Sequence, residues 1–515
     1  MVVFSWNRGA KLVRMAVSLA HLYRTATLIL ILAAGGPAAA GFQAAPDAAR
    51  RFARANEYVQ AGKPEAAIPI YKELTAAFPA EPSFGVNLTI AQYKAGLYRD
   101  ALRECDRLLR LQPELFPAWL FRGASYLKLG EASSAIEPLR KALTMRPDDV
   151  NARLMLADAL LAVRNHAEAA AQYVSAARAM PDNPRPWYGL QLCYRALAEQ
   201  LHAQLDRTAP ASAEFLALTA DFETDRGEWA RAYRHYRQAL ALRPSFRGLH
   251  GKVAEIYERT GHPAWALAER GHETNPASPP CDDSSAECEF AAGRLESAAG
   301  STQDTPGALY WRAAALRMLS QRAAAKLQDL PPARERFEAA AETEELSARY
   351  RDAAAAWKQA LALAPGDHEL QRRLALALCH SNDCASALPL LHDLLSRSPA
   401  SVELNYLYGL ALNSTQDPGR ALPYLETAVR LDAGFLPAHA ALGEAYLQAG
   451  KPEQAIPHLE AASREDDTGN RHYQLARAYQ ATAQQARARE ALLAYRVILD
   501  RRAAEERDEP KITPP

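Results

Sequence analysis

The sequence has no excess of charge of either sign. Its 515 residues include 60 Lys and Arg and 60 Asp and Glu, so the formal net charge at pH 7 is +0. Nucleic-acid binding needs clustered Lys and Arg in excess of the acidic groups, so this balance argues against a nucleic-acid partner. Gly and Pro are also scarce, at 25 and 33 residues, which excludes a low-complexity linker protein.

The motifs that would indicate catalysis are also missing. No phosphate-binding loop, nucleophile elbow or acid/base pair occurs in a suitable context, and the 13 His are scattered without metal-ligand spacing. The haem-attachment pattern Cys-x-x-Cys-His is absent. We therefore expect a protein that is not an enzyme and that uses no metal and no cofactor.

The N-terminal residues differ in composition from the rest of the chain. Arg14 and Arg24 precede the apolar run 26–34, and the small residues 38–40 follow a Gly-Gly-Pro break. A basic segment, a short apolar segment and a small-residue exit predict a secretory signal peptide over residues 1–40. The apolar run is shorter than the roughly 20 residues that span a bilayer, so we expect no stable membrane span after cleavage.

Cleavage after residue 40 would leave a short leader, residues 41–47, and an exported protein that is periplasmic or secreted. The alternative is an uncleaved segment that anchors the chain by its N-terminus. Whether translation starts at Met1 or Met15 is left open, because the basic segment is long when counted from Met1.

A 34-residue period runs through most of the remaining sequence. Prolines recur at this spacing at Pro79, Pro113, Pro147 and Pro181, and again at Pro365 and Pro399. The clearest unit carries Trp119, Gly123, Tyr126, Gly130, Ala135, Ala142 and Pro147. In it, Trp119, Gly123 and Tyr126 are three or four residues apart, so they share one face of a first helix. Gly123 is small where a second helix must pack closely, and Pro147 ends that second helix.

This pattern resembles the tetratricopeptide repeat, over about residues 48–500 and in about twelve units. The resemblance implies an all-α fold, a right-handed α-α superhelix (a solenoid) of stacked helix pairs. No stretch shows the period-2 alternation of strands. Ala433 and Asp467 stand where the period predicts prolines, so those corners should be weaker.

Two breaks in the period suggest two repeat arrays joined by an irregular, Cys-containing insertion. The expected segments are an N-terminal array (48–274), a joint with a partial repeat (275–333), a C-terminal array (334–500) and a disordered tail (501–515).

The six cysteines lie at positions 105, 193, 281, 288, 379 and 384. In an exported chain, cysteines can oxidise in pairs. Cys281 and Cys288 bracket the loop of the joint, so they are candidates for a disulfide. Cys379 and Cys384 flank a turn between two helices, and whether they pair is left open. The other two fall on packing faces and are expected to be buried.

The resemblance also implies that a ligand would lie in a concave groove lined by first-helix residues. At those positions the N-terminal units carry mostly apolar candidates, namely Phe52, Asn56, Val86, Ile90, Tyr93, Leu120, Leu127, Leu154, Leu161 and Tyr188. A contiguous apolar groove favours an amphipathic helix or an extended peptide. The alternative is that neighbouring units simply pack these side chains.

The middle units carry acidic residues at the same positions, namely Glu214, Asp221, Glu255, Glu258, Glu338 and Glu342. Such a lining would favour basic segments of a partner. The alternative is a solvated helical surface.

The leading hypothesis is an exported scaffold or adaptor that binds protein or peptide segments of unknown identity in its groove. A second is binding or export of envelope polysaccharide, with Trp119, Trp187 and Trp229 as stacking platforms. A third is an accessory subunit of an enzyme. A homodimer is left open, because helix repeats associate through exposed ends.

Overall fold

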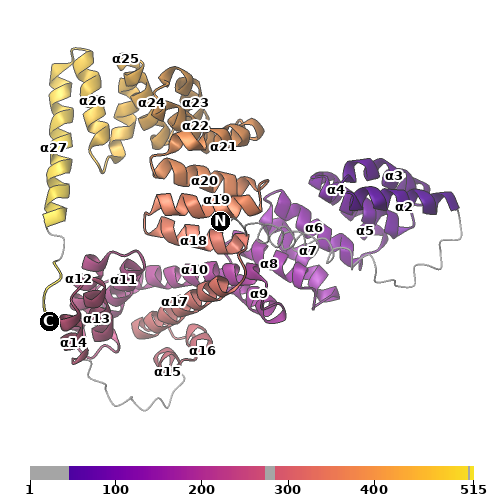
Figure 1. The fold of residues 1–515 in the computed structure, drawn as a ribbon, viewed down its shortest axis with the longest axis horizontal. Coiled ribbons are helices and arrows are strands. Elements are labelled where there is room, and N and C mark those ends of the chain that lie inside the picture. The colour runs from indigo at the N-terminus through magenta and orange to yellow at the C-terminus, as the bar shows by residue number, and fades with distance from the viewer. Residues whose placement is uncertain (1–45, 273–284, 508–510) are drawn as a thin grey trace, which may run out of the picture. The chain divides into compact units, whose positions relative to one another are not determined.

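The computed structural model describes residues 46–272, 285–507 and 511–515 (Figure 1). Every regular element in these residues is helical, which confirms the all-α prediction. The predicted signal peptide, residues 1–40, lies outside the described residues, as does Cys281. The chain forms two compact units that divide within α8 (Val150–Ala162), between Ala159 and Leu160.

The first unit consists of antiparallel helix pairs that follow one another along the chain. Its helices before α8 are α2 (Pro46–Gln60), α3 (Pro64–Ala77), α4 (Pro82–Lys94), α5 (Tyr98–Leu111), α6 (Phe116–Lys128) and α7 (Ala132–Met145). Each packs against the next, and α4 also contacts α6, so a first helix touches the first helix of the following repeat.

The turn within a pair contains a residue in the left-handed region, and in several pairs this residue is glycine. Gly130 has φ of 75° between α6 and α7. Its N–H donates to Leu127 O at 3.1 Å, and the Glu131 N–H donates to Tyr126 O at 2.9 Å. These bonds satisfy the last carbonyls of α6. Gly62, Gly96, Gly227, Gly261 and Gly450 have the same positive φ in other pairs, whereas Arg164, Ala348, Asn382, Gln416 and Ala483 adopt it in the remaining turns without being glycine.

Close packing within a pair depends on small residues at the crossing point. A Cβ built on Gly123 would lie 2.5 Å from Leu139 Cγ on α7. This distance confirms the prediction that Gly123 must be small. Ala135 and Ala142 of α7 are also fully buried.

At the corner between repeats, a main-chain carbonyl accepts a hydrogen bond from the side chain six residues further along the chain. Trp119 Nε1 donates to Pro113 O at 2.7 Å. The same contact occurs at Trp187–Pro181, Asn405–Pro399 and His439–Ala433, at 2.9, 2.8 and 3.1 Å. The corner at Ala433 therefore keeps its side-chain contact although it has no proline.

The second unit, residues 160–515, starts with α9 (His166–Ala179) and a helix of 25 residues, α10 (Pro184–Thr208). After these come α11 (Ala213–Asp225), α12 (Trp229–Leu242), α13 (Leu249–Arg259), α14 (Pro263–Arg270), α15 (Ala286–Ala291), α16 (Leu295–Ala299) and α17 (Pro306–Asp329). α17 packs along α10 in the most extensive helix contact of the described residues.

The predicted irregular joint is therefore largely helical from residue 285 onward. α17 has 24 residues and buries side chains from Ala308 to Leu327. It contacts α10, α11, α15 and α16, so its apolar residues occur on several faces. That distribution explains why its sequence shows helix without the repeat motif.

The rest of the second unit returns to regular pairs, in agreement with the 34-residue period. These helices are α18 (Arg334–Leu346), α19 (Tyr350–Leu363), α20 (His368–His380), α21 (Cys384–Arg397), α22 (Val402–Ser414), α23 (Pro418–Leu431), α24 (Leu436–Gln448), α25 (Pro452–Ala462), α26 (Asn470–Ala481) and α27 (Gln485–Arg507), with a 3₁₀ turn η3 (Ser463–Glu465).

The structure does not support a disordered tail from residue 501. α27 continues to Arg507, because Ala503, Ala504 and the following Glu residues favour helix and no proline occurs before position 510. Residues 511–515 lie without regular structure against α12 and α13, and Ile512 packs on the core of that region.

Candidate functional site

Two tyrosine hydroxyls on adjacent helices bind a residue far away in the sequence. Tyr257 Oη on α13 donates to the main-chain carbonyl of Thr513 at 2.7 Å. Tyr233 Oη on α12 lies 3.1 Å from the same carbonyl and 2.9 Å from Thr513 Oγ1. Tyr257 is fully buried and Tyr233 is 5% exposed. The two hydroxyls thus lie inside the helix layer and face an extended segment.

Each of the three hydroxyl donors, those of Tyr233, Tyr257 and Thr513, has a hydrogen-bond acceptor in this arrangement. A carbonyl oxygen has two lone pairs, so it can accept from both tyrosines. The Thr513 hydroxyl then donates to Tyr233 Oη, which is free to accept. Burial, with the hydrogen bond to Tyr233, raises the pKa of Tyr257 far above its usual range, so this hydroxyl stays protonated and able to donate. The arrangement recognises a main-chain carbonyl together with a β-hydroxyl.

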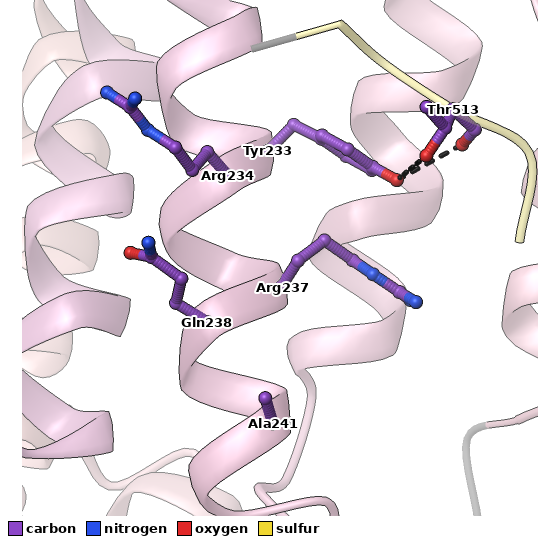
Figure 2. A pocket seen from close by; sticks show the side chains of 6 residues that line it. All are labelled: Tyr233, Arg234, Arg237, Gln238, Ala241 and Thr513. Atoms are coloured by element: carbon purple, nitrogen blue, oxygen red, sulfur yellow. Dashed lines mark hydrogen bonds between the residues drawn. The ribbon is translucent and has the colours of Figure 1, made fainter.

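A shallow cavity of about 360 Å³ continues along α12 beside Thr513. Figure 2 shows Tyr233 and Arg237 on the same side of α12 as Thr513, whereas Arg234 and Gln238 point the other way. Arg237 Nη1 also lies 3.4 Å from Glu269 Oε1 on α14, and His250 Nδ1 lies 2.7 Å from the same oxygen.

The helix α14 is shorter than α12, its counterpart in the preceding repeat. α12 has 14 residues and α14 has eight. Pro263, the first residue of α14, lies one 34-residue period after Trp229, the first residue of α12, so Arg270 corresponds to Tyr236. The second half of α12 therefore has no helical counterpart in the described part of the next repeat.

The predicted apolar groove of the first unit is largely packed. Ile90, Leu120 and Leu154 are only 8%, 5% and 2% exposed, so their side chains hold helices together and offer little surface to a partner. The partly exposed members are Phe52, Asn56, Val86, Tyr93 and Leu127. Val86, Ile90 and Tyr93 do come together, in a cluster with Phe121. Phe52 contacts Tyr71 and Phe84, and Asn56 accepts a bond from Tyr71.

In the second unit, Leu161 is partly exposed and Tyr188 binds an acidic residue. Tyr188 Oη on α10 donates to Glu342 Oε1 on α18 at 2.9 Å, and Arg195 Nη2 lies 3.3 Å from Glu342 Oε2. The structure thus joins one apolar candidate and one acidic candidate in a contact between helices.

All the predicted acidic residues are paired with cations of this chain. Glu338 pairs with Arg334 and Glu214 with Arg243, and burial raises the pKa of Glu338 to about 6. The exposed members also have partners, in the pairs Glu255–Arg259 and Glu258–Arg270. These residues therefore do not form an unpaired acidic lining for a basic partner.

Asp221 is the clearest departure from the predicted groove. It is 1% exposed and joins four helices. Its Oδ1 accepts from Tyr236 on α12 at 2.6 Å and from Lys252 on α13 at 2.5 Å. Arg317 of α17 lies 2.9 Å from its Oδ2 and also binds Asp225. We call Asp221, Tyr236, Lys252 and Arg317 the Asp221 network.

The described cysteines fall into two kinds. Cys105 and Cys193 are buried reduced thiols, as expected from their packing faces. Cys379 and Cys384 are also free, and a hydrogen bond between them holds the pKa of Cys384 below its usual range. Cys288 is buried on α15 and disulfide-bonded, but Cys281 lies outside the described residues, so their pairing stays a prediction.

Two of the three proposed sugar-stacking tryptophans serve the repeat corners, and the third, Trp229, packs on the apolar cluster of α11–α13. Trp119 and Trp187 each donate their indole N–H to a corner carbonyl, which fixes the ring against its own repeat. Within the described ranges, no helix combines the length and apolar character of a membrane span. The same ranges contain no group of three or more His, Cys, Asp or Glu that could hold a metal ion.

The sequence analysis did not single out Tyr233, Tyr257 or Thr513 as site residues. The available signal was the composition of residues 511–515, Lys-Ile-Thr-Pro-Pro. A β-branched apolar residue before two prolines favours an extended segment, since residues that precede proline avoid the helical region. Nothing in the sequence pattern indicated which helices this segment would contact.

Comparison with known proteins identifies the repeats. Two family models, both described as tetratricopeptide repeat, match parts of the chain. One matches residues 126–193 and 412–478, and the other matches residues 52–114, 87–150 and 380–434. These segments together make up less than half of the chain, and they consist of tetratricopeptide repeats.

Curated relatives are similar over short stretches. Sperm-associated antigen 1 of Rattus norvegicus is 28% identical over 116 residues, which is 22% of this chain and 13% of that protein. The Hsp70-Hsp90 organizing protein of Triticum aestivum is 30% identical over 107 residues, or 21% of this chain and 18% of that protein. The chain thus spans less than a fifth of the length of these curated relatives.

Solved structures with similar helices include a tetratricopeptide repeat protein from Parabacteroides merdae. It is 14% identical with a TM-score of 0.32, over 65% of this chain and 100% of that chain. The APC/C hetero-tetramer Cut9-Hcn1 gives 13% identity and a TM-score of 0.31, over 89% of this chain and 94% of that chain. We draw no inference from similarities of this size.

Proposed function

We propose that the protein is a non-catalytic scaffold that holds extended segments of other proteins. The observation that carries this proposal is the contact of Tyr233 and Tyr257 with the main chain of residue 513, in which helix side chains bind an extended segment. The tetratricopeptide repeats support it, because stacked helix pairs provide long surfaces for partners. So does the similarity to the Triticum aestivum protein, whose name describes an organizer of Hsp70 and Hsp90.

A capture experiment tests this function. An affinity-tagged full-length chain is incubated in cell-envelope extract, and bound proteins are cross-linked and identified by mass spectrometry. Val86→Asp/Leu127→Asp places charge at partly exposed members of the predicted groove. Leu111→Asp is the matched control, because Leu111 is 52% exposed at the end of α5, outside that groove.

We expect the native chain and the Leu111→Asp control to retain the same partner and the groove variant to lose it. Retention by all three would place the contact elsewhere on the chain. If the native chain captures no protein, the result would contradict the scaffold function. Leu120 and Leu154 are unsuitable for this test, since charges at such buried positions would disrupt folding.

We also propose that the scaffold acts outside the cytoplasm. The support is the signal-peptide pattern of residues 1–40. N-terminal sequencing of the protein from its own cells is expected to start at or near Gly41. A protein that starts at Met1 or Met15 and sediments with membranes would instead support the uncleaved anchor.

A further inference from the structure

Residues 511–515 contact α12 and α13 in the manner of a bound peptide. The contact joins residues 280 and 256 positions apart in the sequence, so it does not follow from local chain geometry. The segment has no regular structure, and its Ile512 side chain packs against the apolar cluster that includes Tyr233 and Tyr257. Apolar burial and main-chain hydrogen bonding are combined in the same way when folded domains bind extended peptides.

The face of α12 and α13 that contacts residues 511–515 presents two hydrogen-bond donors close together. Tyr233 and Tyr257 come from successive helices and place two donors on one carbonyl, and both side chains are at least nine-tenths buried. Without the segment, the two phenol hydroxyls would lose this acceptor and would be left with each other, at 3.3 Å, and with solvent that enters where the segment lay. The segment gives both donors a carbonyl acceptor and adds the apolar burial of Ile512, so the face favours occupation by a carbonyl-bearing segment.

The contacts define the chemistry of a suitable ligand. The main-chain carbonyl is common to every peptide, so it gives affinity without selectivity. Selectivity comes from the Thr513 hydroxyl, 2.9 Å from Tyr233 Oη, and from the aliphatic side chain of Ile512. Thr or Ser can supply the hydroxyl, and a β-branched residue before it favours the extended backbone. The cavity along α12 beside Thr513 leaves room for a larger ligand.

We propose that this face is a peptide-binding site for an extended segment with a β-branched aliphatic residue followed by Thr or Ser. Residues 511–515 occupy it in cis until a partner's segment replaces them. The inference rests on the proposed scaffold function and assigns it a second site, separate from the predicted first-helix groove. A cis segment has an effective concentration in the millimolar range, so a partner must bind more tightly or be present in excess.

The test measures binding of a fluorescent peptide with the sequence of residues 511–515 to the full chain by fluorescence anisotropy. Ile512→Asp removes the apolar contact and releases the cis segment. Pro515→Asp is the matched control, since it adds the same charge at an exposed position of the same segment. We expect saturable binding to Ile512→Asp, and binding at least about tenfold weaker to the native chain and to Pro515→Asp.

Two further changes locate the site. Adding Tyr233→Phe and Tyr257→Phe to Ile512→Asp keeps both rings but removes both donors, which should weaken the peptide roughly 30-fold. A peptide with Val in place of Thr should bind roughly fivefold more weakly, because it keeps the shape and loses the hydroxyl. Thr513→Val in the chain offers a second way to loosen the cis segment if Ile512→Asp misfolds.

Three results would overturn the proposal. Equal binding to the native chain and to Ile512→Asp would show that the segment does not occupy the face. Absence of binding to both released variants would show that the face is not a peptide site. Binding that Tyr233→Phe/Tyr257→Phe leaves unchanged would place the peptide elsewhere. In each case the capture experiment decides the scaffold function separately. A partner captured by the native chain would still support that function, and capture of no protein would contradict it.

Discussion

Asp221→Ala is expected to lower the free energy of unfolding of the second unit by about 3–5 kcal/mol. The substitution leaves Lys252 and Arg317 close together without the carboxylate that they share, and it removes the acceptor of the Tyr236 hydroxyl. Breaking a buried ion network from one side is costly because the remaining charges are only partly accessible to water. Arg317 would keep only Asp225 as an acidic partner within the network region.

Urea unfolding followed by tryptophan fluorescence measures this effect. Trp311, Trp229 and Trp265 belong to or pack on the cluster around the network, so they report on this part of the chain. Glu258→Ala is the control, because its pair with Arg270 is about half exposed and screened by solvent, so its loss should leave stability nearly unchanged. Similar losses in the two variants would show that the Asp221 network is no more important than a surface pair.

The same network gives an acid-sensitive contribution to stability. Burial alone would raise the pKa of Asp221, but Lys252 and Arg317 outweigh it and lower the pKa below its ordinary value of 3.8. A carboxyl with a lowered folded-state pKa stabilises the fold fully above about pH 4, and this contribution is lost as pH falls through the folded-state value. Asp221→Asn should remove this part of the acid dependence.

The features that the sequence predicted correctly are those set by local spacing. Gly123, Gly130 and the corner prolines act within one helix pair, where helix geometry fixes which side chains meet. The same reasoning predicted a weaker corner at Ala433, but the carbonyl there is bound by His439, and no proline pattern reveals such a donor.

The features that could not be predicted depend on helices brought together from distant parts of the sequence. Asp221 occupies a groove position by register, yet Arg317, 96 residues later, turns it into a buried structural ion. Glu342 is joined to Tyr188 across 154 residues. Thr513 lies in a segment that composition alone identified as a tail. The period places Asp221 and Glu342 on the correct helix face, whereas Thr513 lies outside the period, and the partner of each depends on how α10, α17 or residues 511–515 return to the array.

Gly443→Ala is expected to destabilise the second unit by about 1–2 kcal/mol, although alanine is the better helix former. A Cβ at this position of α24 would lie 2.6 Å from Cγ and 2.7 Å from Cδ2 of Leu459 on α25. Alanine in place of glycine favours a helix by about 1 kcal/mol, and overpacking a core costs about 1–3 kcal/mol. Contacts below 3.0 Å require Leu459 or the helices to shift, and Leu459 is buried, so overpacking outweighs helix propensity.

A double-mutant cycle with Leu459→Ala separates crowding from other effects. Leu459→Ala alone should cost about 2–5 kcal/mol through the cavity that it leaves. In the double variant the new methyl group occupies part of that cavity and no longer meets a leucine, so the combined loss should be smaller than the sum of the single losses.

Gly307→Ala is the matched control, because nothing lies within 4 Å of its added Cβ in the first turn of α17, and it should be neutral or stabilising by about 0.4–1 kcal/mol. In the preceding repeat, a Cβ built on Gly409 would lie 2.6 Å from Leu425 Cγ, so Gly409→Ala should repeat the loss at Gly443. If Gly443→Ala stabilises the protein and its effect simply adds to that of Leu459→Ala, glycine at this position does not set the distance between the two helices of a repeat.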